Sequence, residues 1–325
     1  MTVSASPIGI CAAAYSLPGD PIDFVPWAHG EDVAPRLIDS LLSHGFRYFH
    51  AAPVCSDADF IASAIDKLDA PPGWTRGVRY LVHAHTEAFS MPAPPVSILA
   101  ELSKRYGFEP TMAFSVTHLA CASVISALDC AAQLLARDPD AEYALVVTSD
   151  RVFGDAKYRI WAQNCLQSDG ASAMLLSREG LRCRLGLASF KHFTQLHAGP
   201  STPALAFMVA RDLRHHLTVL LREHEAAAAV PLSDYDQILP FNSDRGDWMR
   251  AATALGLAEG TVYLDNVTAR AHACCADFAV NLVDRGFERL AAGGVQLVFA
   301  HSNVGAYAAL TLWPPASPPA AQEGR

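Results

Sequence analysis

The sequence predicts an α/β protein whose sheets are covered by helices on both faces. The chain has 325 residues, of which 51% are hydrophobic and 18% charged, so it can bury a large core. Short apolar runs of strand length alternate with helix-length segments, and this rhythm repeats in the second half of the chain. Such alternation is typical of helices packed on both sides of a sheet. We therefore expect two pseudo-duplicated α/β halves.

Each half is predicted to contribute several strands. In the first half the strand-like runs are residues 8–15, 79–84, 143–148 and 171–176. In the second half they are residues 181–190, 237–239, 262–264, 295–301 and 308–312. The long helical patterns are residues 204–228 and 274–290.

A charged, glycine-containing turn at residues 177–180 lies between a strand of the first half and a strand of the second. It predicts an N-terminal half at residues 1–177 and a C-terminal half at residues 178–313. Residues 314–325 are rich in proline and alanine and are predicted to be a disordered or loosely attached tail that carries no chemistry.

Charge and hydropathy argue against nucleic acids and membranes as partners. The net charge is −9, the pI is about 5.8, and acidic and basic residues are scattered, so no basic stripe faces a phosphate backbone. The N-terminal apolar run has no preceding Lys or Arg, unlike a signal peptide. We find no apolar stretch near the roughly 18 residues that a membrane helix needs. The expected location is the cytoplasm.

The eight cysteines show no CxxC pair and no regular spacing, which argues against a disulfide framework and a structural zinc site. Most are expected to be buried thiols that pack as small hydrophobes. Cys121 is set apart by its context, because a short strand leads into it and a helix follows it. Unpaired backbone N–H groups at a helix N-terminus favour the nucleophilic thiolate. A structural thiol at the start of a buried helix is the alternative interpretation.

The sequence around Cys121 resembles ketoacyl synthase III of the thiolase superfamily over residues 78–173. The matching pieces occur in the order of that family: the strand Arg-Tyr-Leu-Val-His-Ala from Arg79, Ala-Cys-Ala-Ser at Cys121, the strand from Tyr143, and Ser-Asp-Gly-Ala-Ser-Ala from Ser168. The resemblance implies a thiolase-like fold with two halves in a five-layer αβαβα arrangement, and a homodimer. It implies no metal or redox cofactor, only a thioester of coenzyme A or acyl carrier protein as acyl donor.

Two positions depart from the family pattern. The family's histidine loop reads Ile-Leu-Pro-Phe-Asn-Ser-Asp here, which puts Phe241 at the histidine position. The family's asparagine loop reads Arg-Ala-His-Ala-Cys-Cys-Ala-Asp, which puts His272 at the asparagine position. Phe241 either lines an acyl pocket or marks a displaced alignment. His272 is either the catalytic base, at a different position from the family's histidine, or a structural histidine of the core.

A histidine beside Cys121 suits general base work, and Asp277 or Asp244 is expected to orient it. The resemblance also yields candidates for the oxyanion or acceptor side of the site. Backbone N–H groups between Asn303 and Gly305, paired with that of Cys121, are placed to bind the thioester oxygen. The other candidates are Asn242 and His301.

These residues favour an acyltransferase in natural-product biosynthesis. Cys121 would take an acyl group from the thioester donor, and a small-molecule hydroxyl or amine acceptor, activated by His272, would remove it. Two alternatives stay open. One is decarboxylative carbon–carbon condensation with His272 and Asn242 replacing the lost pair, and the other is a non-catalytic subunit of a heterodimeric synthase.

Overall fold

The structure is a computed structural model that describes residues 7–51, 55–86, 95–152, 156–161, 165–193, 203–302 and 305–315. Within these residues nine strands form one mixed sheet in the order β11-β12-β13-β10-β1-β9-β6-β4-β5. The strands from the first half of the chain are β1 (Gly9–Ser16), β4 (Val78–Ala84), β5 (Met112–Val116), β6 (Tyr143–Asp150) and β9 (Gly170–Ser177). Those from the second half are β10 (Cys183–His192), β11 (Gln237–Pro240), β12 (Gln296–His301) and β13 (Ala306–Trp313).

The sheet consists of two parts that meet along a short seam. β1 pairs with β9 over most of its length, from Gly9↔Ser177 to Ser16↔Ala171. It pairs with β10 only at Gly9↔Arg184 and Ile10↔Cys183. The parallel strands β6, β4 and β5 therefore form one half-sheet with β9 and β1, and β10 to β13 form the other. Two small ribbons, β2 (Ile22–Asp23) with β3 (Tyr48–Phe49) and β7 (Ile160–Trp161) with β8 (Cys165–Leu166), lie outside the large sheet.

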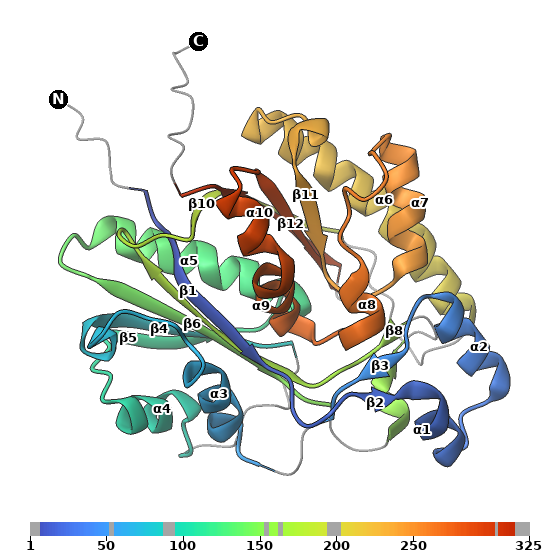
Figure 1. The fold of residues 1–325 in the computed structure, drawn as a ribbon, viewed down its shortest axis with the longest axis horizontal. Coiled ribbons are helices and arrows are strands. Elements are labelled where there is room, and N and C mark those ends of the chain that lie inside the picture. Colours follow the sequence, from blue (N-terminus) through green and yellow to red (C-terminus); the bar gives the residue numbers. More distant parts are fainter. Residues whose placement is uncertain are drawn as a thin grey trace.

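Helices cover both faces of each half-sheet (Figure 1). On the first half-sheet these are α3 (Asp57–Ile65), α4 (Ile98–Tyr106) and α5 (Ser123–Arg137), whereas α1 (Phe24–Gly30) and α2 (Pro35–Ser43) pack with residues of the second half. In the second half they are α6 (Pro203–Ala228), α7 (Arg245–Leu255), α8 (Asp265–Arg270), α9 (Asp277–Asn281) and α10 (Phe287–Ala291).

Three buried clusters define the layers. In the central cluster, residues of α5 and α9 pack against strands of both half-sheets, including Val146 of β6 and Val298 of β12. A second cluster packs α3 and α4 on the outer face of the first half-sheet, and a third packs α6, α7 and α8 on the outer face of the second. This gives the predicted order of helix, sheet, helix, sheet and helix layers, with α5 and α9 in the middle.

The predicted strands are confirmed with one exception. Residues 262–264 form no strand, because Val262 makes only an isolated bridge to Ile238. The predicted helix at residues 274–290 is real but interrupted. It starts as a 3₁₀ turn (Cys274–Ala276), continues as α9, passes through a π-helical turn (Leu282–Gly286) and ends as α10.

Two further expectations concern membranes and the chain ends. One segment, Ala120–Arg137, is long and apolar enough to cross a membrane by length and composition, contrary to our expectation, yet 56% of it is buried as the central helix of the core. The predicted tail lies outside the described residues from residue 316 onward. The predicted boundary between residues 177 and 178 stays a prediction and falls between β9 and β10.

Candidate active site

Cys121 lies where the sequence predicts, in a turn directly before the central helix. The 3₁₀ turn Ala120–Ala122 runs into α5 at Ser123. Ala120 has a φ of 46°, a left-handed conformation that costs energy for a residue with a Cβ and is often found at functional sites. The side chain of Cys121 is buried, at 7% exposure. Its thiol therefore sits near the N-terminal end of the α5 dipole.

The His272 loop is fixed by backbone hydrogen bonds to the segment before β9. The His272 N–H donates to the Leu166 carbonyl at 3.0 Å, and the Ser168 N–H donates to the His272 carbonyl at 2.9 Å. A Cβ on Gly170 would lie 2.8 Å from the Cβ of Ala273, so only glycine lets the loop approach β9 this closely. The Ser-Asp-Gly turn is thus structural, and it supports the loop that carries His272.

Cys121, His272 and Asp277 form a continuous hydrogen-bonded chain. The Cys121 Sγ is 3.3 Å from the His272 Nε2. On the other side of the ring, the His272 Nδ1 is 2.5 Å from the Asp277 Oδ2. Nucleophile, imidazole and carboxylate therefore lie in the order that a catalytic triad requires.

The Asp277 carboxylate is fully buried and receives several further hydrogen bonds. The Ala273 N–H donates to Oδ1 at 2.8 Å, and the Asn242 N–H donates to Oδ2 at 2.8 Å. The Asn242 side-chain amide donates to Oδ1 at 3.1 Å, and its own carbonyl accepts from Asn281 at 3.1 Å. These donors offset the cost of burying the charge and fix the carboxylate facing His272.

The surroundings favour a thiolate–imidazolium pair. A hydrogen bond from Cys274 lowers the pKa of Cys121, and the charge of His272 lowers it further, so that it lies well below its usual value despite burial. Burial alone would lower the pKa of His272, but the charges of Asp277 and Cys121 raise it well above its usual value. The His272 Nε2–H then donates to the sulfur, which is the activated form of a cysteine nucleophile.

Three residues beside the nucleophile were not foreseen. The Thr86 hydroxyl donates to the Cys121 Sγ at 3.3 Å. Asp150, at the end of β6, accepts from the Thr86 N–H at 2.6 Å and from the Cys275 N–H at 3.0 Å. The third is Cys274, whose sulfur lies within 4.8 Å of both the Cys121 sulfur and a ring nitrogen of His272, a set of atoms that can hold a metal ion. The sequence signal that could have identified Cys274 is the Cys-Cys pair directly after the loop that carries His272.

Comparison with known proteins finds similarity around Cys121 and in the fold. Residues 116–192 match the family described as 3-oxoacyl-acyl-carrier-protein (ACP) synthase III, and this match contains Cys121. FabH from Pseudomonas aeruginosa PAO1, a 3-oxoacyl-(acyl carrier protein) synthase III, has the same fold with a TM-score of 0.77. It is 19% identical, and the alignment covers 96% of this chain and 100% of that one. Residues 116–192 are therefore similar to ketoacyl synthase III, and the chain as a whole has the fold of these proteins.

Two other structures share this thiolase-like fold. ChlB3, an acyltransferase, has a TM-score of 0.76 and 19% identity, with 95% of this chain and 98% of that chain covered. A variant of OleA from Xanthomonas campestris has a TM-score of 0.76 and 14% identity, with the same coverage of 95% and 98%. The comparison with curated proteins gives no match. The predicted resemblance and fold class are confirmed.

The other residues predicted for the site lie around Cys121, His272 and Asp277 in different roles. Phe241 is fully buried, with its ring 6.2 Å from that of His272. Of the two carboxylates proposed to orient His272, Asp277 does so, whereas Asp244 caps α7 and bonds to His44. Asn242 commits its amide to Asp277 and so supports the carboxylate instead of reaching toward an acceptor.

Only part of the predicted oxyanion side of the site lies within the described residues. Asn303 lies outside the described residues. The Gly305 N–H makes a long 3.4 Å bond to the Ser302 carbonyl, and its φ of 82° together with the nearby Phe193 carbonyl requires glycine. His301 bonds to the Ser243 hydroxyl at 3.3 Å, and burial lowers its pKa to about 3, so its ring is neutral.

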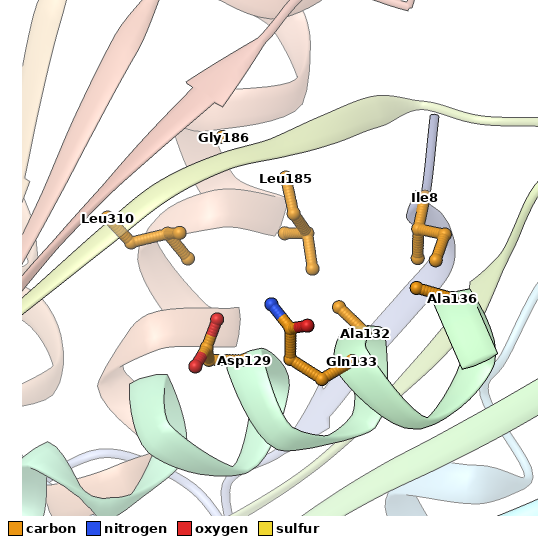
Figure 2. A pocket seen from close by; sticks show the side chains of 8 residues that line it. All are labelled: Ile8, Asp129, Ala132, Gln133, Ala136, Leu185, Gly186 and Leu310. Carbon is orange, nitrogen blue, oxygen red and sulfur yellow. The ribbon is translucent and has the colours of Figure 1, made fainter. Parts of the chain in front are cut away.

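A cavity of about 150 Å³ lies elsewhere on the chain, between α5 and the strands β10 and β13 (Figure 2). Asp129 and Gln133 extend from α5 toward Leu185 and Leu310. Burial raises the pKa of the Asp129 carboxyl. None of the lining residues is a nucleophile or a histidine, so the cavity is separate from the Cys121 site.

Proposed function

We propose that the protein is an acyltransferase that forms an acyl-Cys121 intermediate and passes the acyl group to a hydroxyl or amine acceptor. The donor is an acyl thioester of coenzyme A or of acyl carrier protein. The observation that carries the proposal is the unbroken chain from Cys121 through His272 to Asp277. The base touches the sulfur directly, which is the arrangement of an enzyme that acylates and deacylates a thiol.

In the first step the Cys121 thiolate attacks the thioester carbonyl carbon. A new sulfur–carbon bond forms and the donor's sulfur–carbon bond breaks. The departing thiolate takes the proton from the His272 Nε2, which leaves the imidazole neutral. Burial of all three triad residues keeps water from competing for the acyl group.

In the second step the neutral imidazole acts as a base. Its Nε2 takes the proton from the acceptor hydroxyl or amine as the oxygen or nitrogen attacks the acyl-Cys121 carbonyl. The sulfur–carbon bond breaks, and the Cys121 thiolate returns beside the imidazolium. Asp277 holds the ring in place through both steps and stabilises its charged form.

The residues around the triad favour a heteroatom acceptor over carbon–carbon condensation. The Phe241 ring is a buried hydrocarbon with no hydrogen-bond donor, and it stands where the resembling family has a histidine. His272 replaces the asparagine. The pair that would bind the thioester carbonyl of a malonyl extender is therefore missing, whereas a single base for a hydroxyl or amine is present.

The experiment is intact-mass spectrometry of the protein with a panel of acyl thioesters, followed by addition of acceptors. We expect one acyl adduct per chain, lost in Cys121→Ala and kept in Cys130→Ala, which removes a thiol of α5 that lines the depression beside β5. In His272→Ala the adduct should form slowly and then persist, with transfer reduced about 100-fold or more, the range that general base catalysis contributes.

Three results would contradict the proposal. An adduct that survives in Cys121→Ala would place the chemistry elsewhere. Release of carbon dioxide from malonyl thioesters, with a new carbon–carbon bond, would show condensation. Absence of any adduct across the panel would favour a non-catalytic subunit.

We also propose that the protein forms a homodimer through the edge of the first half-sheet. β5 is the last strand of the sheet order, and Met112, Ala113 and Ser115 on it are exposed. Beside it, Phe114, Leu134 and Cys130 line a shallow apolar depression. An uncovered edge strand with apolar neighbours is a surface on which a second strand can pair.

A further inference from the structure

A second thiol reaches the active site and has no covalent role in the proposed acyl transfer. Cys274 starts the 3₁₀ turn that follows the histidine loop, with a φ of 52°. This turn mirrors the Ala120–Ala122 turn of the first half, which also begins with a left-handed residue and leads into a central helix. Pseudo-duplication therefore brings two such turns face to face, and each carries a cysteine toward the same point.

The three side chains form a compact set of metal-binding atoms. The sulfurs of Cys121 and Cys274 and a ring nitrogen of His272 all lie within 4.8 Å of one another, and all three residues are buried. The Cys121 Sγ and the His272 Nε2 are 3.3 Å apart. A tetrahedral zinc ion with ordinary bond lengths holds such atoms roughly 3.5 to 3.8 Å apart. Small shifts of the side chains are enough to place an ion between them.

The His272 ring is oriented to bind a metal ion together with the two sulfurs. Its Nδ1 is bonded to the Asp277 Oδ2 at 2.5 Å, which points Nε2 toward the two sulfurs. Histidines that bind zinc in proteins commonly hold a carboxylate on the other ring nitrogen, because this fixes the ring and raises its basicity. Asp277 is itself held by Ala273 and Asn242.

We propose that Zn²⁺ binds to Cys121, His272 and Cys274 and reversibly blocks the nucleophile. Two thiolates and an imidazole are a preferred zinc ligand set, and the fourth position is open to water. Binding displaces the protons of the Cys274 thiol and the His272 Nε2 to solvent. The ion is an inhibitor here, not a cofactor, because it occupies the sulfur that would attack the thioester. Metal binding is independent of the proposed acyl transfer, and only its inhibitory effect rests on it.

The test is a zinc titration of metal-free protein in competition with a chromophoric chelator. We expect one Zn²⁺ per chain and protection of Cys121 from alkylation by iodoacetamide, measured by peptide mass spectrometry. In Cys274→Ser the affinity should fall about 10-fold or more, since a ligand is lost. The matched control is Cys275→Ser, which removes the neighbouring buried thiol outside the cluster and should keep the wild-type affinity.

Equal affinity in Cys274→Ser and wild type, or no stoichiometric binding, would overturn the proposal. If Cys274→Ser does not fold, the wild-type cobalt complex decides. Charge-transfer absorption from two thiolates and a four-coordinate spectrum support the site, and a one-thiolate or six-coordinate spectrum refutes it. Recovery of alkylation with a chelator alone supports metal binding, whereas recovery that needs a reductant shows thiol oxidation instead. These measurements hold even if no acyl transfer is found.

Discussion

At the scale of single residues, the active sulfur is stabilised without solvent. The Cys121 thiolate has three donors in the protein, from His272, Thr86 and Cys274, and little exposure to water. Thr86 follows β4, whereas His272 and Cys274 lie in one segment of the second half, so the thiolate is stabilised where these two segments meet. Hydrogen bonds to a charged group are stronger than those between neutral groups, and losing one is costly where no water can replace it.

Thr86→Val removes one of these donors while keeping the shape of the side chain. A hydrogen bond to a charged group contributes about 1.5 to 3 kcal/mol, so we expect the pKa of Cys121 to rise and its alkylation rate, at pH values below the wild-type pKa, to fall about 10-fold or more. The measurement is the rate of iodoacetamide modification by peptide mass spectrometry. Thr86→Ser keeps the hydroxyl and should retain most of the rate, and an unchanged rate in Thr86→Val would show that the contact is incidental.

The sequence could identify the triad residues but not their neighbours. Cys121, His272 and Asp277 stand in local motifs whose order along the chain is visible. Thr86 and Asp150 are brought together only by the parallel register of β4 and β6, in which Ala84 pairs with Thr148. No local pattern reports that register, so the residues just beyond the strand ends could not be assigned.

At the scale of elements, a partly buried hydrogen bond between His44 and Asp244, an ion pair when His44 is protonated, joins two helices beside the site. His44 follows the last residue of α2, and Asp244 caps α7 at its first turn. Their side chains are 3.0 Å apart, and the Arg245 N–H donates to the His44 carbonyl at 3.2 Å. α7 follows the loop that carries Phe241 and Asn242, so this junction fixes one end of that loop.

The junction should make stability depend on pH. The hydrogen bond to Asp244 raises the pKa of His44 above its ordinary 6.5, against the opposing effect of burial. Because the folded pKa is the higher one, the contribution is fully present below about pH 6.5 and is lost as pH rises through the folded pKa. We expect His44→Gln to lower the unfolding free energy by about 1 kcal/mol at acidic pH and by less at alkaline pH.

Urea unfolding at about pH 5.5 and about pH 8.5 measures this difference. Ser43→Ala changes a neighbouring side chain at the same helix end and should have the same effect at both pH values. A constant difference for His44→Gln across the range would mean that the pair does not titrate as described.

The element boundaries show what a sequence pattern can and cannot report. Apolar strands such as β6 and β9 are fully buried and were found to within two residues. Residues 262–264 are equally apolar but lie between a glycine turn and α8, where only one residue meets a strand. The 3₁₀ turn at the start of the helix begins at Cys274 with a left-handed φ of 52°, which a cysteine in the sequence does not predict.

At the scale of the whole molecule, the proposed dimer would cover β5, the strand at the end of the nine-stranded sheet. Met112 is 47% exposed on β5, and a charge there would be buried against the partner strand. We expect Met112→Lys to convert a dimer to a monomer, because an unpaired charge in an interface opposes association.

Light scattering on a sizing column gives the mass of each variant. Met249→Lys is the matched control, because Met249 is 55% exposed on α7 in the other half and should leave the dimer intact. A wild-type protein with the mass of one chain, or a dimer that tolerates Met112→Lys, would contradict the proposed interface.

The contact between Cys121 and His272 joins residues that are 151 positions apart, one from each half. Contacts of such long sequence separation form late in folding, because a large loop must close first. A refolding chain can regain its helices and strands while its sulfur is still an ordinary thiol. Thiolate reactivity at Cys121 would then appear only when the two halves dock. The rate at which this reactivity appears would therefore report the last step of folding.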